Sequence, residues 1–368
     1  MKLGRAISWL LGSLQERLFP QLEECWKTPL TDKEQQLVSI LELVQVEAFV
    51  PRSASDQRLG RKLRERESMA RSFVAKAIYG YPFTRGLIEA LKTAPTLRRI
   101  CGFERVSDIP SESTFSRAFG EFARSRLGQR VHEALVERCL KPELVGHISR
   151  DSTAIEGREK PVKKPPREKA APRKRGRPAK GEQREPKEQK RLDRQCDQSA
   201  EEALRELPVF CDCGAKKNSK GFKETWIGYK LHADINDCGL PVSVVLTAAS
   251  VHDSQVAIPL MKMTSAKVDY LYDLMDSAYD AGPIYEVSKS LGHVPIIDKN
   301  SRGKEIIPMA PHEAARYNER TAAERFNSRI KEEFGAGNIM VRGAQKVMMH
   351  LMFGVIAVFA DQLLKLAT

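Results

Sequence analysis

Four polar residues near the C-terminal end of the sequence have acidic, basic and hydroxyl side chains at a spacing that could bring them onto one helical face. They are Tyr317, Arg320, Glu324 and Lys331. On a helix, which turns about 100° per residue, they would lie within roughly 60° of one another. That face would offer a carboxylate flanked by an aromatic hydroxyl and two cations. A solvated helix face with an Arg320–Glu324 ion pair fits the same spacing, and for these residues alone it is the preferred interpretation.

Two aspartates lie where strands are predicted to end. Asp151 stands toward the end of a short strand predicted over 147–153, and Asp276 lies just past a strand predicted over 267–274. Either aspartate segment is weak evidence for an active site when it is considered by itself. Together with Glu324, however, they supply three acidic side chains on three separate elements.

The elements that must position these carboxylates alternate between strand and helix from about Val145 onward. A hairpin is predicted over 226–249, with its turn at Asp237-Cys238-Gly239. A further strand is predicted over 294–297, and helices are predicted over 254–263, 284–291, 313–334 and 344–366. This order predicts a mixed α/β domain over 145–368, with Glu324 on the long helix.

A second group of candidate residues precedes one of these helices. His252-Asp253 could act as an acid–base pair or as metal ligands. Asp and Ser are favoured N-cap residues, so the preferred interpretation is structural, with Asp253 or Ser254 capping the helix 254–263.

The first 144 residues are predicted to form an all-α N-terminal domain. Thr31 and Glu34 have the spacing of a capping box, ahead of apolar residues at helical spacing. Other helical patterns cover 68–79, 86–91 and 130–140. The fold class is therefore α/β, preceded by a helical domain.

One further helix of this domain is predicted to start at Pro110 and Ser111. Its first turns carry Ser113, Thr114 and Arg117, and hydroxyl or guanidinium groups at a helix start are suited to phosphate contact. The segment could be the recognition helix of a helix-turn-helix or simply a capped helix in a bundle. The sequence leaves both interpretations open.

A basic insertion, residues 158–206, separates Asp151 from the rest of the predicted sheet. Its stretch from Arg158 to Arg194 holds 16 Lys and Arg against 6 Asp and Glu, and no aromatic Phe, Trp or Tyr. Such a composition cannot bury enough apolar surface to offset chain entropy, so we expect the insertion to be disordered in the free protein. Within it, Arg175, Gly176 and Arg177 resemble the core of an AT-hook, which lies in the narrow A·T minor groove. Non-specific phosphate binding by a solvated tail is the alternative.

The overall composition favours a nucleic-acid partner in a reducing compartment. The formal charge of +13 and the pI near 9.4 point to a polyanion. Seven cysteines, odd in number and scattered, favour reduced thiols in the cytosol over a disulfide framework. The most apolar stretch, 351–360, is about half of the ~20 residues that cross a bilayer, so no membrane partner is expected.

Taken together, these features resemble one family. The Tyr-x2-Arg-x3-Glu-x6-Lys spacing of the four C-terminal residues is similar to the signature of a subgroup of DDE-type transposases from bacterial insertion sequences. The segments 276–280 and 151–153 resemble that family's second- and first-aspartate segments. Segments 226–230, 251–254 and 110–115 are also similar, so the resemblance covers nearly the whole chain.

The resemblance implies an RNase H-like fold, a mixed sheet flanked by helices, in which Asp151, Asp276 and Glu324 converge as catalytic metal ligands. It implies Mg²⁺, with Mn²⁺ as a substitute and two ions per site, because hard cations prefer carboxylate oxygens. The other three signature residues would bind DNA phosphates beside the scissile bond. Asp273 and Asp280 are alternatives for the second aspartate, but Asp273 lies inside the predicted strand and Asp280 lies past the aromatic residue, so Asp276 is preferred.

The function that the resemblance implies is cut-and-paste transposition in the bacterial cytoplasm, in association with the nucleoid. The partners would be double-stranded DNA, as transposon inverted repeats and target, and a second copy of the chain in a homodimer on DNA. Two alternatives stay open. One is a catalytically inactive DNA-binding protein derived from a transposase, and the other is a metal-dependent nuclease of the same fold.

Overall fold

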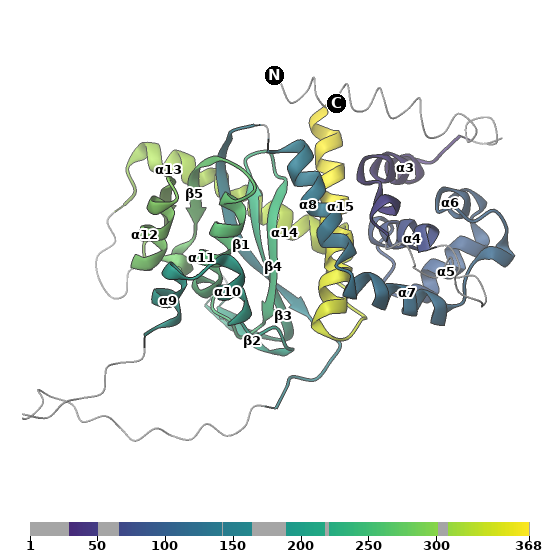
Figure 1. The fold of residues 1–368 in the computed structure, drawn as a ribbon, viewed down its shortest axis with the longest axis horizontal. Helices are drawn as coiled ribbons and strands as arrows, with labels where there is room; N and C mark the ends of the chain where they lie inside the picture. Colours follow the sequence, from purple (N-terminus) through teal and green to yellow (C-terminus); the bar gives the residue numbers. More distant parts are fainter. Residues whose placement is uncertain are drawn as a thin grey trace, which may run out of the picture.

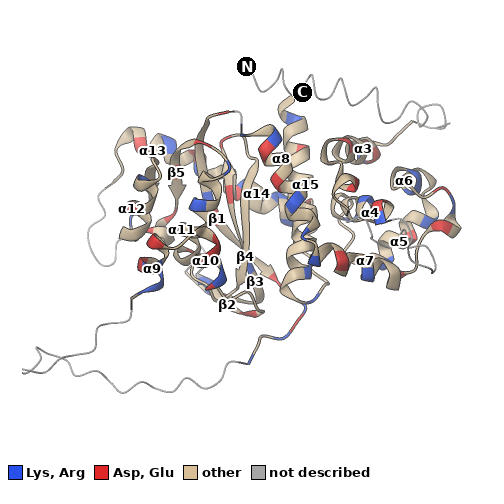
Figure 2. Ribbon diagram, viewed as in Figure 1, with Lys and Arg blue, Asp and Glu red and all other residues tan. Residues whose placement is uncertain are grey.

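The computed structural model describes residues 29–50, 66–141, 143–163, 189–217, 221–300 and 308–367. These residues form a mixed α/β body joined to an all-helical N-terminal part (Figure 1). Figure 2 shows basic and acidic residues interspersed along the described helices and strands. This agrees with the sequence count, in which most of the excess positive charge belongs to the insertion.

Six strands of the described chain form one mixed sheet, in the order β2-β3-β1-β5-β6, with β4 paired to β3. Their bounds are β1 Val145–Glu156, β2 Asp212–Lys217, β3 Lys223–Asn236, β4 Pro241–Ala248, β5 Tyr270–Met275 and β6 Val294–Ile297. The predicted hairpin corresponds to β3 and β4, and the strand predicted over 294–297 is confirmed as β6. Strand β2 was not predicted. Central β1 pairs antiparallel with β3 and parallel with β5.

The regular elements described in the N-terminal part are all helices, as predicted. Its α-helices are α3 Asp32–Val44, α4 Arg66–Ile78, α5 Thr84–Thr93, α6 Pro95–Ile100, α7 Glu112–Arg124 and α8 Leu127–Cys139, with short 3-10 turns at η1 Val46–Phe49 and η3 Val106–Asp108. The predicted capping box is present, because the Thr31 hydroxyl accepts from the Glu34 amide at 3.3 Å and the Thr31 amide donates to the Glu34 carboxylate at 2.9 Å. Local sequence therefore determines where this helix begins.

The remaining helices cover the sheet and link it to the N-terminal part. They are α9 Arg191–Asp197, α10 Ala200–Arg205, α11 Ser254–Ser265, α12 Gly282–Ser290, α13 Pro311–Tyr317, α14 Thr321–Glu332 and α15 Ala344–Ala367, with 3-10 turns at η4 Ser277–Tyr279 and η5 Asn318–Arg320. Helices α14 and α11 cover opposite faces of the sheet. Asn327 of α14 reaches Asp151 of β1, whereas Thr264 of α11 reaches Asp234 on the other side of β3.

The C-terminal helix α15 packs against α8, α3, α4 and α7 of the N-terminal part and also against α14 and β4 (Figure 1). It is the one helix, within the described ranges, that is long and apolar enough to cross a membrane, and 78% of its most apolar window is buried inside the protein. A single apolar core runs from the N-terminal helices through α15 to the sheet. The division into domains at residues 144 and 145 therefore stays a prediction.

The single long helix predicted over 313–334 is wrong. The chain forms α13 first, then the 3-10 turn η5, and then α14. A 3-10 turn advances about 120° per residue instead of 100°, so the common helical face predicted for the four signature residues is broken before Glu324. The break places Arg320 at the junction, where it contacts Glu324 of α14 and lies 4.0 Å from Asp151 of β1.

The expectation of disorder over 158–206 is wrong for residues 158–163, where Glu159 and Val162 make hydrogen bonds with Gly343 and Cys211, and for residues 189–206. Residues 189–206 contain α9 and α10, which pack on α11. The Gln195 side chain is buried and donates to the Gln255 carbonyl at 2.9 Å, and Lys262 of α11 donates to three carbonyls at the end of α9. These hydrogen bonds and the buried Ala203 supply the stabilisation that composition alone did not reveal. The AT-hook-like Arg175, Gly176 and Arg177 lie outside the described residues.

Candidate active site

Asp151 and Asp276 are aligned by the pairing of two parallel strands. The last paired position of β1 and β5 joins Arg150 to Met275, and the two aspartates are the next residue on each strand. Asp276 keeps an extended backbone, so side-chain alternation turns both aspartates away from the face that carries Arg150 and Met275. Asp151 still pairs with Ala233 of β3, so it lies in the middle of β1, at the point where pairing with β5 stops.

Burial and mutual repulsion disfavour the charged form of this pair. Burial, opposed by a hydrogen bond from the Ser152 backbone and reinforced by Asp276, raises the pKa of Asp151 to about 6. Burial likewise raises the pKa of Asp276, whereas the Ala278 amide, at 2.9 Å from its carboxylate, lowers it. Two neighbouring carboxylates with raised pKa values favour binding of a cation, because a positive charge would offset both effects.

Helix α14 contributes polar groups to the same place. The Asn327 side-chain amide nitrogen donates to Asp151 at 3.0 Å. The side-chain oxygen of Asn327 is buried without a hydrogen-bond partner. The Arg320 guanidinium lies 4.0 Å from the Asp151 carboxylate. Burial lowers the pKa of Arg320, but the neighbouring acidic groups, with Asp151 foremost, outweigh burial and raise it. Asn327 was missed by the sequence reasoning, although it lies three residues beyond Glu324 and hence on the same helical side.

Glu324 is separated from the two aspartates by the Arg320 side chain. Its carboxylate lies 2.6 Å from the Arg320 guanidinium, and 56% of its side chain is exposed. Arg320 therefore stands between Glu324 and Asp151 and contacts both. The structure brings Asp151, Asp276 and Arg320 together, and it leaves Glu324 at the rim of the site.

The other two signature residues are placed differently. The ring of Tyr317 lies 5.7 Å from the Arg320 guanidinium, so Tyr317 belongs to the same cluster. Lys331 is half-buried, and the charges that shift its pKa beyond the effect of burial are Lys216 of β2 and Glu156 at the far end of β1. Lys331 thus lies toward the β2 side of the sheet.

The two alternatives for the second aspartate are engaged elsewhere. Asp273 is fully buried, and its oxygens accept hydrogen bonds from Arg150, Tyr270 and Ser288. Asp280 accepts from the Tyr285 hydroxyl at 3.2 Å. Neither contact involves Asp151.

Beneath the site, on the opposite face of β1, lies a buried ion network. Arg150 contacts Asp234 of β3 at 2.6 Å and Asp273 of β5 at 3.1 Å, and all three residues have no exposed surface. Thr264 donates to Asp234 at 2.6 Å. Because Arg150 joins the strands on both sides of β1, the network holds the adjacent Asp151 in register with Asp276.

The predicted cap at the start of α11 is wrong. Asp253 occupies the N-cap position, but its side chain makes no capping hydrogen bond. The His252 ring accepts from the Ser254 amide at 3.4 Å instead. The Asp253 carboxylate is turned to the sheet, where it meets Ser152 and Lys230, both at 2.9 Å. The sequence placed Asp253 and Lys230 in family-like segments, but it gave no sign that they meet.

The donor set fits a divalent cation in part. Across the ranges that the structure describes, no three His, Cys, Asp or Glu side chains lie close enough together to hold one ion. Asp151 and Asp276 are hard oxygen donors, and the unpartnered Asn327 amide oxygen beside them is a third oxygen. Glu324 could complete the set only after leaving Arg320.

On the N-terminal part, the predicted phosphate-contacting residues lie at the start of α7. Ser113 and Arg117 are exposed, and Arg117 donates to the Thr114 hydroxyl at 3.3 Å. The opposite side of the helix is buried, with Phe115 packed edge-on against Phe73 of α4. Helix α7 is therefore a packed bundle helix, and contact of its polar side with DNA stays a prediction.

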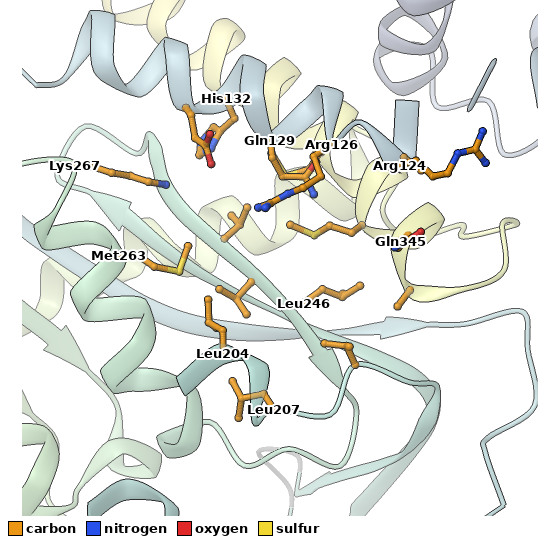
Figure 3. A pocket seen from close by; sticks show the side chains of 18 residues that line it. Arg124, Arg126, Gln129, His132, Leu204, Leu207, Leu246, Met263, Lys267 and Gln345 are labelled. Carbon is orange, nitrogen blue, oxygen red and sulfur yellow. The ribbon is translucent and has the colours of Figure 1, made fainter. Parts of the chain in front are cut away.

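A groove of about 450 Å³ lies away from this site, where α8, β4, α10 and the start of α15 meet (Figure 3). Leu204, Leu207 and Leu246 line its apolar side, and Arg126 and Lys267 are among its polar side chains. None of the predicted site residues lines it. The candidate active site is thus the carboxylate cluster between β1, β5 and α14.

Two protein-family models match the chain. One is described as a transposase DDE domain and matches residues 151–360, more than half of the chain. The other is described as a transposase domain (DUF772) and matches residues 25–121. No curated protein and no solved structure matches the chain. The first match begins at Asp151 and includes Asp276 and Glu324.

Proposed function

Because the chain belongs to the family of transposases with a DDE domain, we propose that it cuts DNA at transposon ends and joins those ends to target DNA. The family supports a DNA transposase, and the DDE domain implies that the six-stranded sheet has an RNase H-like fold. The observation that carries the catalytic proposal is the alignment of Asp151 and Asp276 on neighbouring parallel strands, with α14 alongside.

In this proposal Asp151, Asp276 and Glu324 hold divalent metal ions, Mg²⁺ or Mn²⁺. Ions held there would supply Lewis-acid activation of a water or a DNA 3′-hydroxyl and charge stabilisation of the leaving oxygen. The chain's own residues prepare for this. Asn327 orients the Asp151 carboxylate through its hydrogen bond. The pairing of β1 with β5 keeps the two aspartates side by side.

Arg320 is the residue on which the arrangement depends. In the free protein its guanidinium binds Glu324 and lies near Asp151. A DNA phosphate is a bidentate acceptor that competes for the same guanidinium. We infer that Arg320 moves from Glu324 to a phosphate when DNA enters, which frees Glu324 to join the aspartates. Tyr317, stacked near Arg320, and Lys331 would bind phosphates farther along the strand.

The finer parts of the proposal concern the subgroup and the DNA. The Tyr317-to-Lys331 spacing supports the subgroup with the Tyr-x2-Arg-x3-Glu-x6-Lys signature and hence cut-and-paste transposition from inverted repeats in the bacterial cytoplasm. Helix α7, through Ser113, Thr114 and Arg117, would contact the repeat. Arg175–Arg177 would enter an A·T minor groove. Joining two transposon ends requires two active sites, which favours a homodimer on DNA.

A second candidate function is that of a catalytically inactive DNA-binding protein derived from a transposase. One observation favours it, namely the pairing of Glu324 with Arg320 at the rim of the site, away from the two aspartates. The two candidates differ in whether DNA and metal draw Glu324 inward.

We expect metal-dependent cleavage to separate the candidates. The full-length protein would be incubated with DNA carrying the inverted repeats that flank its gene, with Mg²⁺, Mn²⁺ or EDTA, and cleaved strands would be resolved at single-nucleotide level. Nicks at the repeat tips that require metal would support the transposase. The control is the same DNA with scrambled repeats. Binding without cleavage would favour the inactive candidate, and cleavage of both DNAs alike would favour a nuclease.

The insertion provides a second prediction. Replacing residues 164–188, which hold ten Lys and Arg against four Glu, by a Gly/Ser linker of equal length should make DNA affinity less dependent on salt. Each lost phosphate contact lowers the slope of log affinity against log salt by about 0.9. Glu159, which accepts from the Gly343 amide at 3.1 Å, and α9 are kept, so the fold is spared. An unchanged slope would show that this segment does not bind DNA.

A further inference from the structure

Asp253 forms a polar network that the catalytic proposal does not use. It lies at the N-terminal end of α11, between β1 and β3, and one oxygen of its carboxylate accepts from the Ser152 hydroxyl and from the Lys230 ammonium, both at 2.9 Å. No hydrogen bond from a described residue reaches the other oxygen, and 24% of the side chain is exposed. A residue suited to capping a helix is held against the sheet instead.

This network lies directly behind the two catalytic aspartates. Ser152 follows Asp151 on β1, and side-chain alternation puts Ser152 on the α11 face and Asp151 on the α14 face. The Asp253 charge is close enough to raise the pKa of both Asp151 and Asp276. Because Asp253 lies across the sheet from Asp151, it can act on the site through its charge without being a metal ligand.

Lys230 is the cation that holds Asp253. Only 12% of its side chain is exposed, and it also donates to the Val251 carbonyl at 2.8 Å. The ring of His232 lies 3.9 Å from the Asp253 carboxylate, and burial lowers the pKa of His232 to about 4, so it is neutral at pH 7. Burial alone would raise the pKa of Asp253, but the Lys230 charge and the hydrogen bonds from Lys230 and Ser152 outweigh burial and lower it. Asp253 therefore keeps its negative charge.

We propose that Asp253 is a fourth acidic residue of this active site, a positioning residue whose charge strengthens divalent-cation binding by Asp151 and Asp276. Lys230 fixes that charge behind the sheet, and its own positive charge opposes cation binding. The proposal rests on the proposed function and extends it to two family-like segments, 226–230 and 251–254, that had no role. The charge of Asp253 therefore favours cation binding at the site, whereas the charge of its ion-pair partner Lys230 opposes it.

The test is a titration of the full-length protein with Mn²⁺ in the absence of DNA, followed by electron paramagnetic resonance of free Mn²⁺. Asp253→Asn removes the negative charge and leaves Lys230, so we expect the Mn²⁺ affinity to fall by about tenfold. Lys230→Gln removes the opposing charge, so the affinity should rise by a few-fold. Glu89→Gln on α5, a charge change in the N-terminal part, is the matched control and should leave the affinity unchanged.

The opposite changes in Mn²⁺ affinity expected for the two variants distinguish an electrostatic effect from damage to the fold. If both variants weakened Mn²⁺ binding, or if Asp253→Asn left it unchanged, the proposal would be overturned. The Mn²⁺ affinity of the Asp151→Asn variant distinguishes failure of the inference about Asp253 from failure of the proposed function. If Asp151→Asn does not weaken Mn²⁺ binding, the metal site itself is wrong. If it does and Asp253→Asn does not, only the inference about Asp253 fails.

Discussion

Replacing Glu324 by glutamine should reduce the rate of strand cleavage by about a thousandfold or more, while DNA affinity in EDTA stays within about twofold of wild type. Glutamine keeps the size of the side chain but lacks the charge that a divalent cation requires. Folding should change little, because the Glu324 side of the Arg320–Glu324 pair is 56% exposed, and pairs screened by solvent contribute about 0–1 kcal/mol. Single-turnover cleavage of repeat DNA and a binding titration would measure the two quantities.

The matched control for this variant is Glu333→Gln. Glu333 lies at the end of the same helix and pairs with Arg329 at 3.1 Å, in the same i,i+4 arrangement. Its replacement also breaks an exposed ion pair on α14, but far from Asp151, so cleavage should persist. Equal loss in both variants would attribute the effect to the helix. Loss of DNA binding to the same degree as cleavage in Glu324→Gln would show that Glu324 is structural.

The second large effect concerns the buried network behind β1. Arg150→Met should lower the free energy of unfolding by about 3–5 kcal/mol, because it leaves Asp234 and Asp273 buried without their cation. Burial raises the pKa of Asp234 even with Arg150 present. Without Arg150, both carboxyl groups must take up protons or rearrange. Urea unfolding of the metal-free protein at pH 7.5, followed by circular dichroism, would measure the change.

The control for Arg150→Met is the triple variant that also carries Asp234→Asn and Asp273→Asn. It removes the uncompensated charges, and it should recover part of the lost stability because a buried ion network contributes little beyond neutral packing. The wild-type network is itself incompletely satisfied, since Arg150 Nε and Asp234 Oδ1 are buried without partners. A loss below about 1 kcal/mol for the single variant would mean that the network does not hold β1 between its neighbours.

Several elements could be predicted because they depend on residues that are neighbours in the sequence. The capping box at Thr31 and Glu34 needs four consecutive residues. The turn that joins β3 to β4 needs a glycine, and Gly239 has a positive φ of 79°. The residue types and spacing around Glu324 were sufficient to indicate the transposase family, which the family models support.

The sequence by itself therefore determined most of the element types, the acidic residues available and the family. Only the tertiary structure decided how those residues meet. The register of β1 with β5 joins residues 125 positions apart and is set by burial on both faces of the sheet. Likewise, the Asp253 carboxylate contacts Lys230 and Ser152 instead of capping α11. Arg320 lies between Glu324 and Asp151. In both cases a charged group in a partly buried region pairs with the partner that the fold brings within reach. Such pairings leave no periodic pattern along the chain.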